Sequence, residues 1–112
     1  MDTPEKTRTQ QVIQYLRQEF DADDVQLAEL LFALVVNLQE IADASRRALN
    51  TAHWEGLAHA GHSLKGVGAN IGQEDLRLTG AGLEDAAGAK DRDKTLLLLA
   101  KLDAVLKELG SD

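Results

Sequence analysis

Apolar residues recur every three or four positions along most of this 112-residue chain, which is the spacing of one face of an α-helix. Leu and Ala supply 35 residues, whereas Val, Ile and Thr, which favour strands, supply 15. The single proline, Pro4, stands near the start, so no later proline breaks a helix. These features predict an all-α fold in a single domain over residues 1–112, because a chain this long suits one core.

Turn and capping residues divide the chain into five predicted helices. The first extends from a cap at Thr3 to about Phe20, and the second, long helix begins after Asp23 or Asp24. The remaining three span about residues 52–71, 73–87 and 91–109, each followed by a glycine at position 72, 88 or 110. Short connections place consecutive helices antiparallel. We therefore expect an up-and-down four-helix bundle over about 23–109, with residues 1–20 as an additional N-terminal covering helix.

Each predicted helix has an apolar face that we expect in the core. These faces consist of Val12, Ile13, Leu16 and Phe20; Leu27, Leu30, Leu31, Leu34, Leu38, Ile41 and Leu49; Leu57, Leu64, Gly68 and Ile71; Leu76, Gly80, Leu83 and Ala87; and Leu98, Leu99, Leu102, Val105, Leu106 and Leu109. Phe32, Val35 and Val36 widen the stripe of the second helix, which predicts that other helices contact it on two sides.

The formal net charge of −7 argues against a nucleic-acid partner, since phosphate binding needs a basic stripe and the chain has none. A membrane is not expected either, because the longest uncharged apolar stretch, Leu30 to Gln39, is about half as long as a spanning helix. The charged N-terminus does not resemble a secretory signal, and the chain has no cysteine. These observations predict a cytoplasmic protein.

The segment from Gly56 to Gln73 differs from the rest of the chain. Among its 18 residues, Lys65 is the only charged one, and eight of the nine glycines fall between Gly56 and Gly88. A glycine inside a helix costs about 0.5–1 kcal/mol relative to alanine, so Gly61, Gly66 and Gly68 call for a reason. Close approach by another backbone or by another protein would supply one.

Helix geometry predicts that His62 faces outward, on the side opposite to the apolar stripe of its helix. Small residues surround it on that face, and Lys65 lies one turn further on. A neutral imidazole nitrogen is a nucleophile near pH 7, and an adjacent ammonium group can offset the charge of a transferred phosphoryl group. The expected partner-binding residues are Ala58, His59, Gly66 and Ala69.

The stretch from His62 to Gly72, HSLKGVGANIG, followed by Leu76 and by Leu83 and Glu84, resembles the histidine phosphotransfer (HPt) domain of bacterial phosphorelays. The resemblance covers about residues 20–109. It implies that His62 carries phosphate on Nε2, that Lys65 interacts with the phosphoryl group and that Glu84 orients Nδ1 of the imidazole. Gly61 departs from the alanine usual in this family, and it is expected to loosen the helix locally without removing the chemistry.

The resemblance also implies a non-enzymatic phosphocarrier that exchanges phosphate with the aspartate of a response-regulator receiver domain or of a hybrid histidine kinase. It needs no cofactor of its own, because the Mg²⁺ is bound by the receiver. The sequence contains no nucleotide-binding loop of P-loop or kinase type, so autophosphorylation from ATP is not expected. A monomer suits shuttling between partners. Neither the donor and acceptor nor the output of the pathway follows from the sequence.

Three other interpretations stay open at this stage. The pair His59 and His62 could suggest a metal site, but di-metal bundles need a Glu-x-x-His pair from each of two helices, and no such pair is present. A helical docking module without phosphotransfer would use the same small-residue face around Gly66. The phosphoaccepting module of a chemotaxis-type kinase shares the His-x-x-Lys-Gly pattern.

Overall fold

The computed structural model describes residues 5–110, and in that range it contains five α-helices and no strand. The helices are α1 (Arg8–Phe20), α2 (Asp24–Asn50), α3 (Trp54–Asn70), α4 (Glu74–Gly88) and α5 (Arg92–Glu108). Their order and most of their boundaries agree with the periodicity of the sequence to within a few residues. The all-α class is therefore confirmed.

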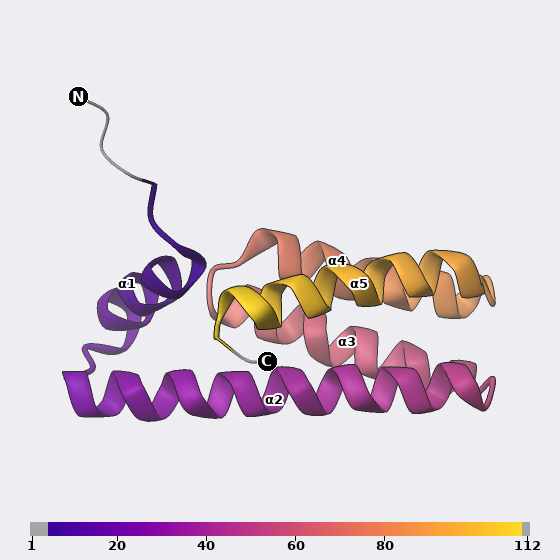
Figure 1. Ribbon diagram of the computed structural model, residues 1–112, viewed down its shortest axis with the longest axis horizontal. Coiled ribbons are helices and arrows are strands. Elements are labelled where there is room, and N and C mark those ends of the chain that lie inside the picture. The colour runs from indigo at the N-terminus through magenta and orange to yellow at the C-terminus, as the bar shows by residue number, and fades with distance from the viewer. Residues whose placement is uncertain (1–4, 111–112) are drawn as a thin grey trace.

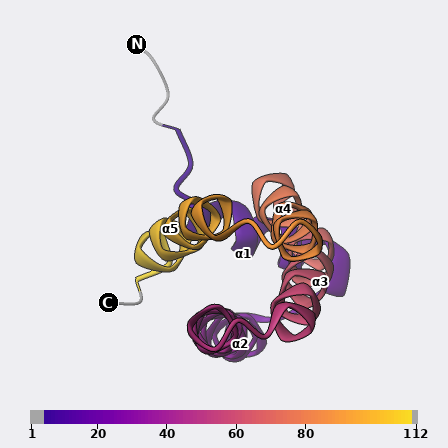
Figure 2. The ribbon, with the colours of Figure 1, turned by 90° about the vertical axis from the view of Figure 1, so that its right-hand side faces the viewer.

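Helices α2 to α5 lie side by side along the long axis of the molecule, and α1 lies at the end where α2 begins (Figure 1). Viewed along that axis, α2, α3, α4 and α5 follow one another around an arc (Figure 2). Each helix contacts the next in sequence, and α5 also contacts α2, while α1 contacts α2 and α5. The four long-axis helices thus enclose a shared core, which α1 closes at one end.

The core consists mainly of the leucines that the sequence periodicity places inward. The predicted core residues that are buried are Val12, Leu16, Leu27, Leu34, Leu38, Ile41, Leu49, Leu57, Leu64, Ile71, Leu76, Leu83, Ala87, Leu99, Leu102, Val105, Leu106 and Leu109. Ile13, Leu31 and Leu98 are half-buried against them. Burial of one such leucine contributes about 1.5–3 kcal/mol, so these faces fix which side of each helix points inward.

The start of the first helix differs from the prediction. The expected cap, Thr3, lies outside the described residues, and α1 begins at Arg8 after a cap by Thr7. The Thr7 side chain accepts a hydrogen bond from the backbone of Gln10, whose side chain accepts one from the Thr7 backbone. This capping box fixes the start of α1. The same arrangement of Asp23 and Gln26 starts α2, so the cap is Asp23, one of the two predicted candidates, and Asp24 is the first residue of the helix.

Two expectations about the apolar faces are wrong. The Phe20 side chain is 60% exposed, because α1 ends there and Asp21 turns the chain into the left-handed region. On α2, Leu30 is 40% and Phe32 72% exposed, although other helices, α3 and α5, contact α2 on two sides, as predicted. For Leu30 the reason is length, since α2 has 27 residues and α3 only 17, so α2 is about 15 Å longer. Phe32 is two positions from buried Leu34, so its side chain points to the opposite side of the helix.

Helix α2 is also the one described helix that is long and apolar enough to span a membrane by length and composition. Its most apolar 18-residue window has a mean hydropathy of 1.5, and 28% of that window is buried inside the protein. Much of this apolar surface therefore faces outward in the isolated chain.

Arg8 attaches the start of α1 to α4 and α5. Its guanidinium donates two hydrogen bonds to the carboxylate of Asp75, at 2.7 and 2.9 Å, one to Glu108 at 2.7 Å and one to Gln73 at 2.7 Å. The Arg8 side chain is 13% exposed. The hydrogen bonds to Asp75 and Glu108 raise the pKa of Arg8, while Arg8 holds the pKa of Asp75 below its usual 3.8.

Replacing this guanidinium, Arg8→Met, removes its hydrogen bonds and is expected to lower the free energy of unfolding by about 1–2 kcal/mol. The loss is no larger because the two carboxylates are half exposed and solvent screens them. Urea unfolding measures the loss. Arg17→Met, which removes one exposed pair with Asp24, should cost less than about 0.5 kcal/mol. Equal losses in the two variants would contradict a special role for Arg8.

The Arg8 contribution should also depend on pH. Because the folded-state pKa of Asp75 is lowered, the unfolded chain takes up the proton first as the pH falls. The stabilisation is therefore complete above about pH 5 and is lost as the pH falls below about 4. The difference in unfolding free energy between wild type and Arg8→Met should shrink between pH 7 and pH 3.

Candidate functional site

Glycines allow the backbones of α3 and α4 to approach closely at the centre of the molecule. A methyl group on Gly80 would lie 2.3 Å from the backbone nitrogen of Lys65, and one on Gly61 would lie 2.8 Å from the backbone nitrogen of Glu84. At Gly68 the corresponding distance to the backbone nitrogen of Arg77 is 2.3 Å. No side chain fits at these positions without separating the helices, which answers why the predicted helix contains so many glycines.

Gly61 consequently does not loosen the helix, contrary to the expectation from the sequence. Helix α3 continues through it from Trp54 to Asn70, and Gly61 itself is buried against α4. Because Gly61 has no side chain, the backbone of α4 at Glu84 lies directly beside it, next to His62 in the sequence. The departure from alanine is therefore a packing feature.

His62 projects from the middle of α3 into solvent. Its side chain is 70% exposed, whereas Leu57 and Leu64 on the opposite side of the same helix are fully buried. The prediction that His62 faces outward is confirmed. An imidazole in this position is accessible to another protein along the length of α3.

Lys65 and Glu84 lie next to the imidazole. Lys65 Nζ is 2.8 Å from Glu84 Oε1, and His62 Nδ1 is 3.9 Å from the same oxygen. This oxygen is shielded from solvent, and its contact with Lys65 is an ion pair that lacks the alignment of a hydrogen bond. His62 and Lys65, both on α3, thus approach the same carboxylate oxygen of Glu84 on α4. At 3.9 Å this oxygen is close to the imidazole but is not hydrogen-bonded to it.

The small-residue face around His62 is open. Gly66 has nothing within 4 Å of the position of a side chain, in contrast to Gly68, which packs against α4, and both placements agree with the prediction. His59 and Ala69 are exposed. Ala58 is half-buried against the core, so it lies at the edge of this face rather than on it.

Within residues 5–110, no group of three or more His, Cys, Asp or Glu side chains is placed to hold a metal ion. His62 and Glu84 approach each other, but their third neighbour is the ammonium group of Lys65, which repels a cation. The site is built instead to meet an anion: a ring nitrogen is exposed and a positive charge stands beside it.

Sequence reasoning identified all three side chains of this site but not the pairing between Lys65 and Glu84. The two residues are on different helices, so no spacing rule connects them. It also placed Gly80 on an inner apolar stripe and did not assign it to the helix contact that brings Glu84 to His62. The clustering of glycines in both segments was the available signal.

A comparison with protein-family models identifies the Hpt domain over residues 6–112, which is nearly the whole chain. No curated protein and no solved structure matches it significantly. The match, an all-helical fold and an exposed histidine beside a lysine in the middle of a helix agree with one another. The chain belongs to the Hpt domain family of two-component signalling.

Proposed function

We propose that this protein is a phosphorelay intermediate whose α2–α5 helices form the antiparallel four-helix bundle of a phosphotransfer domain. In this proposal it receives a phosphoryl group from the aspartate of a receiver domain, holds it on His62 and passes it to another receiver, in the cytoplasm. The observation that carries the proposal is the exposed imidazole of His62 with Lys65 and Glu84 at its side. As a phosphocarrier the chain would need no cofactor of its own, because the Mg²⁺ used in the transfer is bound by the receiver.

Each transfer exchanges one bond for another. Nε2 of neutral His62 attacks the phosphorus of the receiver's aspartyl phosphate, a P–N bond forms, the bond from phosphorus to the aspartate oxygen breaks, and the carboxylate leaves. The proton on Nδ1 stays on the ring. Nδ1 is 3.9 Å from Glu84 Oε1, so a small rotation of the ring would let Nδ1–H donate to this oxygen and leave Nε2 free for the attack.

Lys65 has a second role in this scheme. It pairs with Glu84 while the histidine is unmodified, and a phosphoryl group on His62 would bring a competing, stronger negative charge within its reach. Movement of the ammonium group toward the phosphate would release Glu84 Oε1 to accept from Nδ1. Glu84 would thereby hold the ring and keep Lys65 in place between transfers.

Incubation with a phosphorylated receiver and Mg²⁺ tests the proposal. The chain should acquire a phosphate that is labile in acid and stable in base, as a phosphoramidate is, and should then pass it to a second receiver. If no receiver from the same organism labels the wild-type chain, the phosphorelay role is wrong, and a docking role without phosphotransfer is favoured.

Lys65→Ala should slow labelling by about tenfold to a hundredfold, since removal of one charge-stabilising donor costs about 1.4–2.7 kcal/mol in the transition state. The unfolding free energy should change by less than about 1 kcal/mol, because the pair with Glu84 is partly exposed. Lys101→Ala, an exposed lysine on α5, is the matched control and should transfer at the wild-type rate. A large loss of stability in Lys65→Ala would make the lysine structural.

A further inference from the structure

The reacting groups around His62 all come from this one chain. The imidazole and the ammonium group of Lys65 project from α3, and the carboxylate of Glu84 comes from α4. In the proposed transfer, a receiver adds only the phosphoryl donor and its Mg²⁺. A donor much smaller than a receiver would therefore meet the same nucleophile, the same cation and the same carboxylate.

The approach to His62 is open for such a donor. The imidazole side chain is 70% exposed, and nothing lies within 4 Å of the side-chain position of Gly66, one turn further on. The Lys65 side chain is 37% exposed, so solvent also reaches its ammonium group. An ammonium group has three N–H donors, and Glu84 approaches it from one side, at 2.8 Å. The other donors can meet the oxygens of a phosphoryl group.

The other two histidines have different neighbours. His59 is exposed on α3, three residues before His62. One turn before His59, on the same side of the helix, is Glu55, whose carboxylate repels an anionic donor. His53 caps the start of α3. Among the three histidines, only His62 has a lysine or arginine within four residues in the sequence, and that residue is Lys65.

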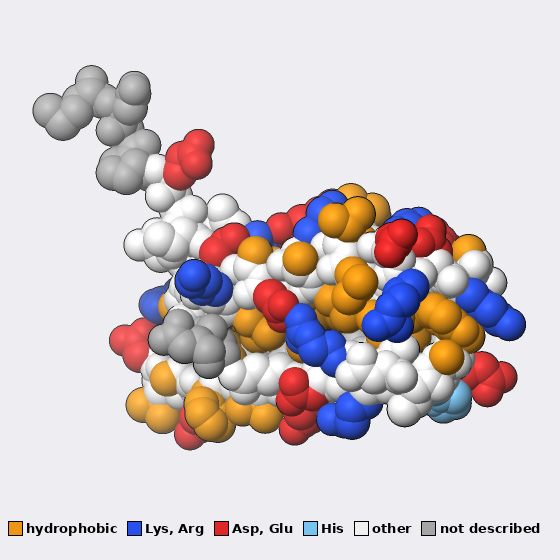
Figure 3. All heavy atoms as spheres, turned by 45° about the vertical axis from the view of Figure 1, so that its right-hand side comes forward, with side chains coloured by type: hydrophobic (Ala, Val, Ile, Leu, Met, Phe, Trp, Pro, Cys, Tyr) orange, Lys and Arg blue, Asp and Glu red, His pale blue; other side chains and the backbone are white. Residues whose placement is uncertain are grey.

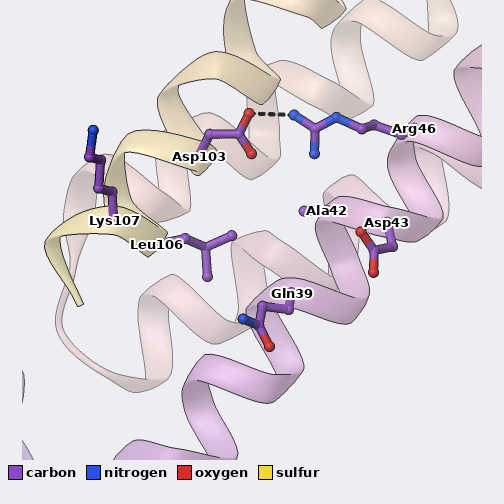
Figure 4. Close-up of a pocket in the computed structure, with 7 residues that line it drawn as sticks. All are labelled: Gln39, Ala42, Asp43, Arg46, Asp103, Leu106 and Lys107. Carbon is purple, nitrogen blue, oxygen red and sulfur yellow. Dashed lines mark hydrogen bonds and ion pairs between the residues drawn. The ribbon is translucent and has the colours of Figure 1, made fainter. Parts of the chain in front are cut away.

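The groove between α2 and α5 also contains basic side chains, but it offers no histidine. On the face shown in Figure 3, Lys and Arg side chains are interspersed with Asp and Glu. Within the groove, a hollow of about 600 Å³ contains Arg46, which pairs with Asp103 across it (Figure 4). No histidine is among the described residues that line this hollow, so an anion bound there would not yield a phosphohistidine.

We propose that His62 also accepts a phosphoryl group directly from small P–N phosphoryl donors, of which phosphoramidate is the simplest. Nε2 of the neutral ring attacks phosphorus, a P–N bond to the ring forms, the P–N bond of the donor breaks, and ammonia leaves. Near pH 7 phosphoramidate carries its proton on nitrogen, so ammonia leaves as a neutral molecule without a further acid. Lys65 offsets the charge of the phosphoryl oxygens. This proposal rests on the phosphoacceptor role of His62 proposed above, but not on a receiver.

Lys65 is the expected source of selectivity among the histidines. Phosphoramidate brings no metal ion, so the ammonium group of Lys65 is the one cation that residues 56–73 offer to the phosphoryl group. Without this lysine, the carboxylate of Glu84 remains 3.9 Å from Nδ1 of His62 with its charge uncompensated, and it repels an anionic donor. The advantage of His62 over His59 would then be lost.

Reaction of the full chain with potassium phosphoramidate, without Mg²⁺ and without any receiver, tests the proposal. Heteronuclear NMR of the histidine rings near pH 7 follows phosphorylation at each of the three sites in the intact chain. His62 should react at least about tenfold faster than His59 or His53. Lys65→Ala should reduce this ratio to about one, and Lys65→Arg, which keeps the positive charge, should preserve most of it. Lys101→Ala, an exposed lysine on α5, is the matched control and should keep the full ratio.

The ratio of rates within one molecule does not depend on the concentration of protein or donor. Equal rates at the three histidines of the wild type, or a ratio that Lys65→Ala leaves unchanged, would overturn the proposal. The wild-type ratio is decisive even where a variant fails to fold. If phosphoramidate selects His62 but no receiver labels it, this inference stands and the phosphorelay role is wrong. If receivers label His62 but phosphoramidate does not select it, this inference alone fails.

Discussion

His62→Gln is expected to abolish phosphorylation of this chain by any phosphorylated receiver, a loss of at least a thousandfold. Glutamine keeps a polar side chain of similar reach but has no nucleophilic ring nitrogen, so no P–N bond can form. The side chain is 70% exposed, and its replacement should therefore leave the free energy of unfolding within about 0.5 kcal/mol of the wild type. Labelling with radioactive phosphate from a receiver measures the first effect and urea unfolding the second.

The matched control is His53→Gln, at the start of α3, which should be labelled at the wild-type rate. Persistent labelling of His62→Gln would remove this residue from the role. Replacing a buried histidine could abolish labelling simply by unfolding the protein. Because the His62 ring is exposed, a loss of labelling can be separated from a loss of stability.

The sequence predicted the helices well because each has a regular apolar period and a glycine or a capping residue near its ends. Asp23 as the cap of α2 and Gly72 at positive φ after α3 are examples. It did not predict how far each helix extends beside its neighbours. Leu30 fits the apolar stripe as well as Leu34 does, and the difference in length between α2 and α3 leaves it exposed. Phe32, two residues from Leu34, instead points to the opposite side of α2.

At the site, periodicity alone was sufficient to predict that His62 faces outward, because the apolar residues of α3 all lie on the opposite side of the helix. Its neighbours on α3, Lys65 and Gly66, followed from spacing. Glu84 followed only from family resemblance, since the distance between α3 and α4 is set by contacts among glycines 19 residues apart, such as Gly61 and Gly80. Side chains on one helix are thus predictable from spacing, and pairs between helices require the packing.

The packing of α3 on α4 therefore gives the second large expected effect. Gly80→Ala should lower the free energy of unfolding by about 1–3 kcal/mol, although alanine favours helices over glycine by about 0.5–1 kcal/mol. The added methyl group would lie 2.3 Å from the backbone nitrogen of Lys65 and 2.6 Å from the carbonyl oxygen of Gly61. Backbone atoms cannot rotate away as a side chain can, so the two helices must separate. Urea unfolding measures the loss.

The same separation should slow phosphoryl transfer, because it moves Glu84 away from both His62 and Lys65, whose side chains come from the other helix. Gly88→Ala makes the identical substitution at the end of α4, where nothing lies within 4 Å of the new methyl group. It should leave transfer unchanged and stability equal or slightly higher. If Gly80→Ala is as stable and as active as Gly88→Ala, the close approach of α3 and α4 does not position the site. A destabilised Gly80→Ala with wild-type transfer would show that the contact supports the fold alone.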